Sequence, residues 1–185
     1  MRNISGVIFI ITLSFIYFNC TTGVDFISDV NLVSNGSFEI GGQPSLAGWN
    51  IYSPDSSAVT FSSDVPPWGG SYSVRLMNQW IRPGWIQTMI VALPDTHVYR
   101  LSAFGKLSPG YYPSYGQVWL SLHKPDTILH VSDLYFYDTS WISKSIVDTL
   151  MIAPGDSVEI AIRGDYHQMA AGYFFVDRVS FEMVK

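Results

Sequence analysis

The sequence predicts an all-β protein, a jelly-roll sandwich of two antiparallel sheets, and three observations support this. Short segments with alternating apolar and polar residues recur from Asn31 onward. Turn-forming Pro, Gly, Asp and Ser residues separate these segments at short intervals. No long stretch carries apolar side chains at helical spacing. Many short strands with this punctuation are typical of a β-sandwich or jelly roll.

Ten strands are expected, each ending at a cluster of turn residues. Their expected ranges are 31–39, 58–62, 72–76, 86–93, 98–107, 117–123, 135–137, 141–150, 157–164 and 174–183. Pairs such as Gly41-Gly42 and Pro94-Asp95 mark the turns, because Gly accepts positive φ and Pro restricts φ. With no internal repeat and no dividing linker, residues 31–185 form one predicted domain.

The segment from Tyr173 to Met183 is a predicted half-buried strand near the C-terminus. Its odd positions are largely apolar and its even positions become polar toward the end, which is the period-two alternation of a strand. Asp177 is expected on the apolar face, where a carboxylate is costly unless it is paired or binds a cation. Two alternatives follow for Asp177: a cation site, or an Arg partner together with backbone N–H donors.

Residues 1–20 have the pattern of a secretory leader, and residues 21–30 form a short predicted tether. Arg2 gives a positive start, and the run from Ile4 to Phe18 is apolar but shorter than a membrane span of roughly 20 residues. Cys20 follows this run, as the lipidated cysteine does in bacterial lipoproteins; the alternative is an ordinary cleaved leader. Both alternatives predict an extracytoplasmic protein, either secreted or lipid-anchored at the cell surface.

Composition limits the classes of partner. The chain of 185 residues has a formal net charge of −5 and no basic cluster, whereas nucleic-acid binding needs a basic face. One cysteine allows no intrachain disulfide. Aromatic residues make up 15% and charged residues 14% of the chain. This balance suits a folded extracytoplasmic β-protein. No second apolar stretch follows the first, so the one membrane contact expected is a lipid anchor, if Cys20 carries one.

Several segments, in order along the chain, carry a family resemblance. Residues 31–39 (NLVSNGSFE) precede Gly48-Trp49, and residues 173–181 (YFFVDRVSF) lie near the end. Residues 70–76 (GSYSVRL) and 84–88 (GWIQT) lie between them. In order and spacing these segments resemble the carbohydrate-binding modules of families 4, 9 and 22, which are galactose-binding-like β-sandwiches. The resemblance implies non-catalytic binding of a poly- or oligosaccharide.

The resemblance also implies a structural calcium ion. In the family that the chain resembles, the first and last strands lie close together. An acidic residue from each strand would then supply hard oxygen ligands, and backbone carbonyls would complete the calcium shell. We carry this ligand role onto Glu39 and Asp177 only.

Alternation within the strands indicates which side chains leave the core. Sugars stack their C–H faces on aromatic rings and exchange hydrogen bonds with polar side chains, so outward-facing residues of both kinds are ligand-binding candidates. The candidates on a sheet face are Trp119, His123, Phe104 and Arg163, and those on the rim include Trp80, Tyr115, Tyr111 and Tyr112, with Trp85 and Tyr166. The alternative for each aromatic is packing, and Trp49, Trp85 and Trp141 are expected in the core.

Two other function classes compete with sugar binding. A small jelly-roll glycosidase or polysaccharide lyase would use a set such as Tyr115, His123 and Arg163. The sequence has no paired-carboxylate strand motif, nucleophile elbow or metal-ligand histidine spacing, so no enzymatic activity is expected. A protein-contact or adhesion module with surface protein partners is the other alternative. An open aromatic sheet face favours sugar binding, whereas a face filled by the chain's own loops favours protein contact.

Overall fold

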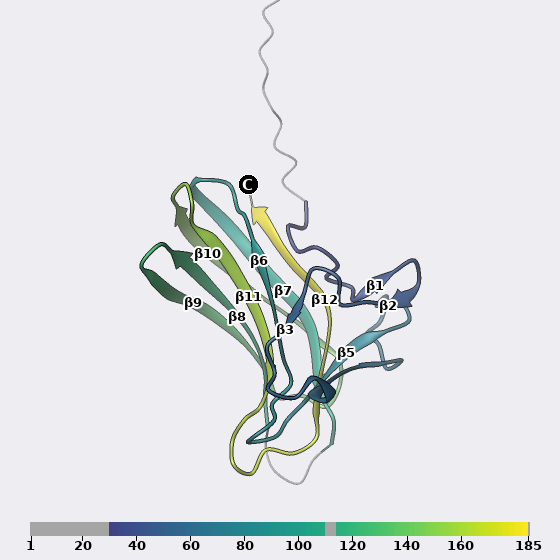
Figure 1. Cartoon of the computed structure of the whole chain (residues 1–185). Coiled ribbons are helices and arrows are strands. Elements are labelled where there is room, and N and C mark those ends of the chain that lie inside the picture. The colour runs from purple at the N-terminus through teal and green to yellow at the C-terminus, as the bar shows by residue number, and fades with distance from the viewer. Residues whose placement is uncertain (1–29, 110–113, 185) are drawn as a thin grey trace, which may run out of the picture.

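The computed structural model describes residues 30–109 and 114–184, and it confirms the all-β prediction (Figure 1). A short 3-10 helix, η1 (Ser56–Ala58), interrupts the strands. The strands are β1 (Glu39–Ile40), β2 (Gln43–Pro44), β3 (Asn50–Ile51), β4 (Val59–Ser62), β5 (Ser73–Met77), β6 (Trp85–Ile90), β7 (Asp95–Leu107), β8 (Gly116–Lys124), β9 (Thr127–Phe136), β10 (Ile142–Ile152), β11 (Ser157–Gly164) and β12 (Tyr173–Val184). Within the described ranges, no helix is long and apolar enough to cross a membrane.

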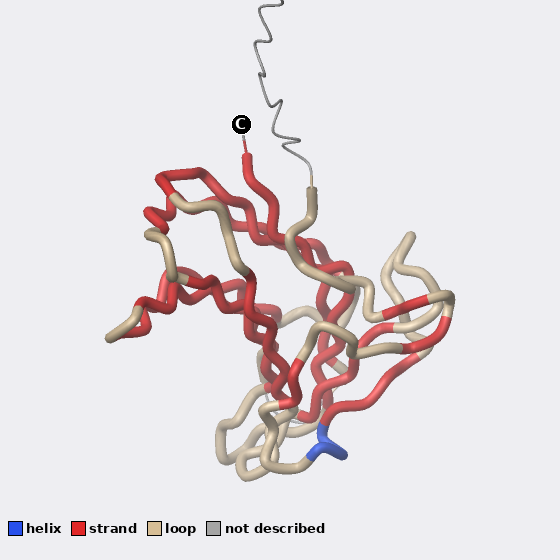
Figure 2. Tube along the Cα trace, turned by 45° about the horizontal axis from the view of Figure 1, so that its top comes forward, coloured by secondary structure: helices blue, strands red, loops and turns tan. Residues whose placement is uncertain are grey.

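Two five-stranded antiparallel sheets form the layers of the sandwich. Sheet I has the order β10-β7-β12-β5-β4, and sheet II has the order β3-β6-β11-β8-β9. A small ladder of β1 and β2 lies beside them. Figure 2 shows many of the loops gathered at the end of the sandwich that carries η1. The predicted jelly-roll β-sandwich of two antiparallel sheets is therefore confirmed.

The core lies between the sheets and follows the alternation that the sequence predicts. Val118, Leu120 and Leu122 of β8 are buried, as are Val158, Ile160 and Ile162 of β11. Large aromatic side chains fill the centre, because they remove the most apolar area from water, at about 25 cal/mol per Å². Among the described residues, the fully buried aromatics are Phe38, Tyr99, Phe136, Phe174 and Phe181. Trp49 is buried beside Phe38, as expected, with their ring centres 5.2 Å apart.

The segment expected to be a first strand at 31–39 is mostly not a strand. Only its last residue belongs to β1, since Asn35 and Phe38 have positive φ and interrupt an extended chain. The segment still lies along β12: the Leu32 N–H donates to the Phe181 carbonyl at 2.8 Å. The Val179 N–H donates to the Gly36 carbonyl at 2.9 Å. The two ends of the domain therefore lie side by side, although not as paired strands.

A β-bulge in β12 corrects the expected position of Asp177. The register with β7 shifts between Asp177 and Ser180, and a bulge exchanges the faces of the residues that follow it. Before the bulge Asp177 pairs with Phe104, which faces outward from sheet I. Asp177 is therefore on the outer side of sheet I, and it is buried there by the turn at Gly69. The sequence interpretation, which placed it on the core face, was wrong.

Most other strands lie within a few residues of their expected ranges. The exception is β9, which is longer than the expected 135–137. A register shift between Leu120 and Ser121 on its partner β8 interrupts the pairing of these two strands. The alternation of β9 is broken there, so its first half has no simple sequence pattern. The predicted leader and nearly all of the tether lie outside the described residues.

Candidate functional site

The outer surface of sheet II carries a row of aromatic and polar side chains. Strand register places Arg163 of β11 opposite Trp85 of β6 on one side and Gln117 of β8 on the other. Gln117 in turn is opposite Tyr135 of β9. Neighbouring strands are about 4.8 Å apart, so these side chains form one line across four strands. We define the aromatic face by this row and its neighbours: Tyr52, Trp85, Gln117, Trp119, Tyr135, Arg163 and Tyr166.

The Arg163 guanidinium is the centre of the aromatic face. Its carbon lies 4.1 Å from the ring centre of Tyr166, 5.2 Å from Trp119 and 5.5 Å from Trp85. Its Nη2 donates to the Gln117 Oε1 at 2.9 Å. Arginine stacks on aromatic rings in this way, and each such contact contributes about 0.5–2 kcal/mol depending on solvent exposure. The contacts hold the rings and the cation in one fixed arrangement before any ligand binds.

The tryptophan rings are packed against each other but remain partly exposed. Trp85 and Trp119 are 5.3 Å apart in an edge-to-face arrangement, and Tyr52 lies 4.6 Å from Trp85. Two buried donors in this cluster, Trp85 Nε1 and Arg163 Nε, have no hydrogen-bond partner among residues 30–109 and 114–184. An unpaired buried donor costs about 1–3 kcal/mol.

Polar contacts fix the side of the face formed by β8 and β9. Gln117 Nε2 donates to the Asp133 carboxylate at 2.6 Å and to the Tyr135 hydroxyl at 3.3 Å. His130 Nε2 lies 2.8 Å from the other Asp133 oxygen. Tyr135 and Tyr137 stack with ring centres 6.2 Å apart, and both are exposed. The rings of Tyr135 and Tyr137 are therefore open to solvent, and the hydrogen bonds around Asp133 hold the surface beside them in place.

Tyr115 lies between the β8–β9 side of the aromatic face and the loop that follows β11. Its ring centre lies 5.4 Å from Tyr135 and 5.6 Å from His167. Asp165 is buried and accepts hydrogen bonds from the His167 ring at 2.6 Å and from its backbone N–H at 3.0 Å. Burial raises the pKa of Tyr115, and the Asp165 carboxylate raises that pKa further. The Tyr115 hydroxyl therefore stays protonated near neutral pH and is a poor general base.

His123 shares the outer surface of sheet II but not the centre of the aromatic face. It follows Gln117 by six positions on β8, which corresponds to roughly 20 Å along a strand. Its Nε2 lies 2.6 Å from the Glu159 carboxylate on β11. The set of Tyr115, His123 and Arg163 that a lyase would use is therefore not brought together.

The structure separates the other predicted binding residues. Phe104 projects from β7 on the opposite sheet, so the expectation that it shares a face with Trp119 was wrong. Trp80 is 53% exposed in the β5–β6 loop, and it contacts no ring of the aromatic face. Tyr111 and Tyr112 lie outside the described residues. Trp119 and Arg163 therefore remain as neighbours on the aromatic face, and Tyr115 lies beside it, against Tyr135.

Two tryptophans expected in the core lie on outer surfaces instead. Trp85 is half-buried in the aromatic face, and Trp141 is half-buried on sheet I. The sequence analysis also missed Gln117 and Tyr135. Alternation could have identified Gln117, because Gln117 lies two positions before Trp119 and faces the same side of the strand. Tyr135 was harder to predict, because the interrupted pairing along β9 breaks the alternation that would show which way its side chain points.

The outer surface of sheet I is partly filled by the chain itself. The Trp141 indole N–H donates to Asp64 at 2.9 Å, and Lys106 forms an ion pair with the same carboxylate. Partial burial raises the pKa of Asp64, but the hydrogen bonds from Lys106 and Trp141 outweigh burial and hold that pKa below its ordinary value. Lys106 also lies 5.2 Å from the Phe175 ring centre. These groups satisfy one another, unlike the unpaired donors of the aromatic face.

Asp177 and Glu39 meet beside a glycine turn. Asp177 is 0% exposed; its Oδ1 accepts the Arg178 N–H at 2.7 Å, and its Oδ2 has no partner in the described part of the chain. A Cβ on Gly69 would lie 2.6 Å from that Oδ2, and a Cβ on Gly70 would lie 2.3 Å from Glu39 Oε2. Both carboxylates therefore line one small turn that only glycine permits.

Electrostatics and backbone strain distinguish this turn. Burial raises the pKa of Asp177 to about 7, the Arg178 N–H opposes that rise, and the Glu39 carboxylate adds to it. Phe38, Trp68 and Arg178 all have positive φ, and such strain of about 1–3 kcal/mol per residue concentrates at ligand clamps. In the described ranges no three His, Cys, Asp or Glu side chains gather. Two neighbouring carboxylates are hard oxygen ligands, which suit Ca²⁺ better than a softer transition metal.

Comparisons with known proteins identify the fold. No protein-family model matches the sequence, and no curated protein is detectably similar to it in sequence. A family 16 carbohydrate-binding module is similar in structure, with a TM-score of 0.59 and 24% identity, over 82% of this chain and 99% of that one. The CBM22-1 xylan-binding domain of Paenibacillus barcinonensis Xyn10C has a TM-score of 0.53 and 14% identity, over 78% and 90% of the two chains.

A part of an enzyme is also similar. The enzymatically active domain of bacteriophage CBA120 tailspike protein 4 has a TM-score of 0.63 and 16% identity, and the match covers 84% of this chain but 22% of the tailspike chain. At these identities the likeness shows the fold alone. The structure therefore has the β-sandwich fold of these carbohydrate-binding modules, as the sequence resemblance implies.

Proposed function

We propose that the chain is a non-catalytic carbohydrate-binding module whose ligand binds on the aromatic face of sheet II. One observation carries this proposal: the rings of Trp85, Trp119 and Tyr166 surround the Arg163 guanidinium on a partly exposed sheet surface. The structural neighbours support it, because most of them are carbohydrate-binding modules. A poly- or oligosaccharide is the ligand class that this mixture of rings and polar groups fits.

The proposed binding chemistry divides between the rings and the polar groups. The C–H faces of a sugar stack on Trp119 and on the exposed tyrosines, which removes apolar area from water. The sugar hydroxyls exchange hydrogen bonds with the hydroxyls of the exposed Tyr135, Tyr137 and Tyr166. Because the protein already holds these groups in place, little conformational entropy is lost on binding.

The absence of catalysis is part of this proposal. A glycosidase needs one carboxyl group as an acid and another carboxylate as a nucleophile or base. The carboxylates beside the aromatic face are each hydrogen bonded to a histidine, Asp133 to His130 and Asp165 to His167, and Glu159 farther along the sheet is hydrogen bonded to His123. The raised pKa of Tyr115 disfavours a tyrosinate base. These pairings support a ligand-holding role rather than a bond-breaking one.

We also propose a structural calcium ion between Glu39 and Asp177. Calcium would supply positive charge to two neighbouring carboxylates, one of them fully buried. It would join the N-terminal segment, the Gly69-Gly70 turn and strand β12. The role would be to stabilise the fold, because these residues lie on the side of sheet I and away from the aromatic face.

The location of the protein is a further part of the proposal. The apolar run that ends before Cys20 supports an extracytoplasmic protein, either secreted or anchored by a lipid on that cysteine. A glycan binder in this location would capture soluble or surface polysaccharides. Metabolic labelling with a fatty-acid analogue, compared between the parent and a Cys20→Ala variant, tests the anchor: equal labelling of the two would contradict it.

A glycan array tests the proposed function. The mature protein, the Trp119→Ala variant and the Trp80→Ala variant would be applied to the same array. Selective binding by the parent and by Trp80→Ala, but not by Trp119→Ala, is expected, because Trp80 is exposed but lies outside the aromatic face. A silent array with a folded parent protein would contradict carbohydrate binding and favour a protein-contact module.

A further inference from the structure

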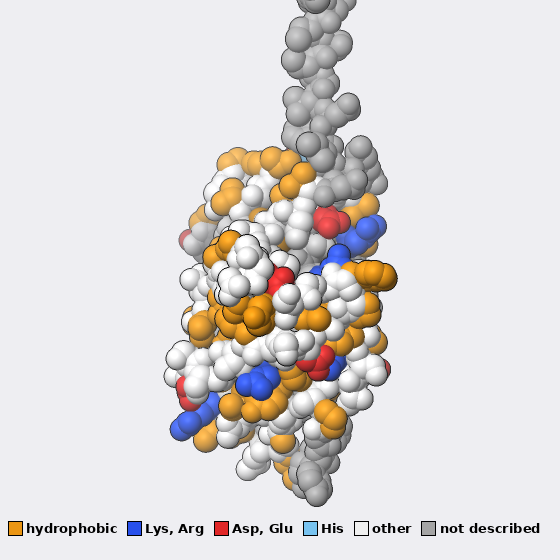
Figure 3. All heavy atoms as spheres, turned by 90° about the vertical axis from the view of Figure 1, so that its right-hand side faces the viewer, with side chains coloured by type: hydrophobic (Ala, Val, Ile, Leu, Met, Phe, Trp, Pro, Cys, Tyr) orange, Lys and Arg blue, Asp and Glu red, His pale blue; other side chains and the backbone are white. Residues whose placement is uncertain are grey.

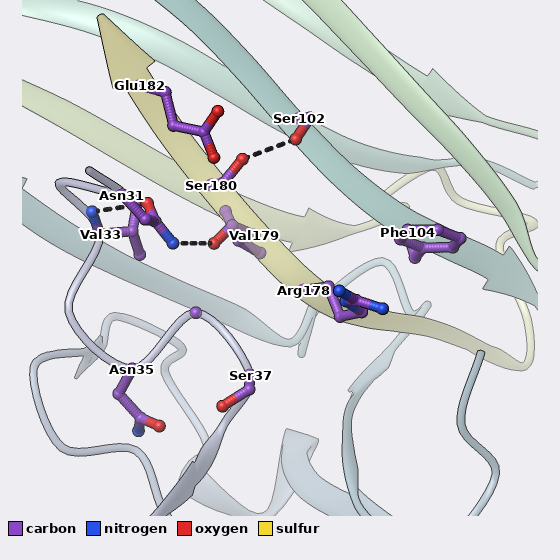
Figure 4. Close-up of a pocket in the computed structure, with 11 residues that line it drawn as sticks. Asn31, Val33, Asn35, Ser37, Ser102, Phe104, Arg178, Val179, Ser180 and Glu182 are labelled. Atoms are coloured by element: carbon purple, nitrogen blue, oxygen red, sulfur yellow. Dashed lines mark hydrogen bonds between the residues drawn. The ribbon is translucent and has the colours of Figure 1, made fainter. Parts of the chain in front are cut away.

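A second, polar hollow lies on the outer side of sheet I, between the N-terminal segment and strands β7 and β12. Its volume is about 460 Å³, within the roughly 300–1,000 Å³ range of small-molecule sites. Figure 4 shows Glu182, Ser180 and Arg178 along β12, with Ser102 and Phe104 on β7. Figure 3 looks onto the side of the molecule that carries β1, β2 and β5, where basic, acidic and hydrophobic side chains are interspersed.

Polar groups with unused hydrogen-bonding capacity line one wall of this hollow. The hydroxyls of Ser102 and Ser180 are 2.7 Å apart and share a single hydrogen bond, so one hydroxyl hydrogen and several lone pairs remain available. Glu182 lies beyond Ser180 on the same side of β12 (Figure 4). The structure records no hydrogen bond or ion pair to its carboxylate from residues 30–109 and 114–184. This wall can both donate and accept hydrogen bonds.

A cation and a ring lie at the other end of the hollow. The Arg178 Nη1 donates to the Trp68 carbonyl at 3.0 Å, which fixes the guanidinium, and the guanidinium carbon is 5.8 Å from the Phe104 ring centre. Arg178 is exposed, so its other N–H groups are accessible to a ligand. The hollow therefore has a carboxylate at one end and a guanidinium beside an aromatic ring at the other (Figure 4).

The floor of the hollow is held rigidly. The Asn31 Nδ2 donates to the Val179 carbonyl at 3.1 Å, and its Oδ1 accepts the N–H groups of Val33 and Phe181 at 2.9 and 3.0 Å. A Cβ on Gly36 would lie 1.9 Å from the Val179 carbonyl oxygen, so the segment is packed directly on β12. A preformed site of this kind binds a small ligand at little ordering cost.

We propose that this hollow is a second carbohydrate site, which binds one neutral sugar residue. Hydroxyl groups can donate to Glu182, exchange hydrogen bonds with Ser102 and Ser180, and accept from Arg178, while a C–H face contacts Phe104. An anionic ligand would be repelled by Glu182, and a cationic one by Arg178. The site has the same three kinds of group as the aromatic face, namely a ring, a guanidinium and hydrogen-bonding side chains.

A second site changes what the module can do. The two sites lie on opposite sheets of the sandwich, and stacked sheets are about 10 Å apart. One short sugar chain cannot lie on both outer surfaces, so each site would hold a different chain or branch. The module would then bridge two glycan chains, and bridging raises avidity for a polysaccharide network without new contacts.

Backbone ¹⁵N–¹H spectra test the second site directly. The mature protein would be titrated with methyl β-glycosides of xylose, glucose and galactose, and with glycine as a dipolar control. At least one glycoside is expected to shift the amides of Ser102, Ser180 and Glu182, in the parent and in Trp119→Ala alike. Glu182→Ala is expected to weaken that binding by about tenfold or more, since hydrogen bonds to a charged group contribute strongly. The same variant should keep the parent's affinity for an array-selected oligosaccharide.

The outcomes separate this inference from the proposed function. Shifts near Arg163 alone would overturn the second site and leave the aromatic face supported. Shifts near Ser180 alone would support the second site and contradict the proposed role of the aromatic face. Shifts at the hollow with glycine but no glycoside, or no shifts there at millimolar glycoside, would also overturn the inference. Equal glycoside affinity of Glu182→Ala and the parent would contradict the assigned ligand contacts.

Discussion

Without calcium, the protein should become less stable as the pH rises from 4 to 7, and Asp177 should cause this loss. Burial raises its pKa in the folded protein from 3.8 to about 7. Below pH 3.8 the carboxyl group is protonated in both the folded and the unfolded chain. Between these two pKa values the unfolded chain releases the proton while the folded chain retains it, so unfolding becomes easier with increasing pH.

The size of the effect follows from the pKa difference. A difference of about three pKa units, at 1.36 kcal/mol per unit, corresponds to roughly 4 kcal/mol of unfolding free energy lost by pH 8. This is a large part of the roughly 5–15 kcal/mol stability of an ordinary domain. Calcium should reverse the loss above pH 7, because a bound cation stabilises the ionised carboxylate.

Urea unfolding measured across this pH range, in metal-free buffer and again with calcium, checks the prediction. Asp64 has a lowered pKa and gives a pH dependence of opposite sign, so the parent is compared with Asp177→Asn rather than interpreted alone. In metal-free buffer, the unfolding free energy of the parent minus that of Asp177→Asn should fall as the pH rises from 4 to 7. Calcium should stabilise the parent alone. Parallel pH profiles for the two proteins would refute the reasoning about Asp177, and a parent unaffected by calcium would refute the ion.

Three further substitutions test the fold and the site. Gly70→Ala should lower the unfolding free energy in urea by about 1–3 kcal/mol, since φ is +85° and the new Cβ would lie 2.3 Å from a Glu39 oxygen. Gly41→Ala has positive φ but open space, so an equal loss there would contradict the contact argument. Phe136→Ala should cost about 3–5 kcal/mol in the same assay, because the ring is fully buried; a loss below 1 kcal/mol would contradict its place in the core. Arg163→Lys should weaken glycan binding in a titration of the folded variant, because lysine cannot stack or form the same fork; unchanged affinity would exclude Arg163 from the site.

The strands could be predicted because alternation is local information. In β8 the sequence distinguishes the buried Val118, Leu120 and Leu122 from the outward Trp119 and His123, and the structure has the same division. The same reasoning holds for β11 and β7. Alternation works here because each strand has one face on a common core.

Alternation does not identify which of the two outer surfaces a side chain joins. Phe104 and Trp119 have the same local pattern, yet strand pairing places them on different sheets. That pairing depends on contacts between residues far apart in the sequence, such as Arg163 with Gln117. The aromatic face could therefore be predicted as a set of residue types, but not as one list of neighbours.

Bulges and positive φ account for the other errors. The bulge at Asp177 reverses the faces of β12, and the positive φ of Asn35 and Phe38 ends the extended chain before β1. Asn is enriched at positive φ, so Asn35 carries a weak signal, whereas Phe38 carries none. The bulge at Asp177 has no glycine that would mark it in the sequence. The predicted closeness of Glu39 and Asp177 was still correct, because the N-terminal segment lies along β12 in either case.

The most direct test of the central claim is a calorimetric titration of the strongest array ligand into three proteins. These are the parent, Trp119→Ala on the aromatic face and Trp80→Ala, which is exposed outside it. We predict that Trp119→Ala binds at least about tenfold more weakly than the parent, because truncation of a central aromatic anchor usually has an effect of this size. The affinity of Trp80→Ala should stay within about twofold of the parent's. Equal affinity of Trp119→Ala and the parent, with both proteins folded, would contradict a carbohydrate site on this face.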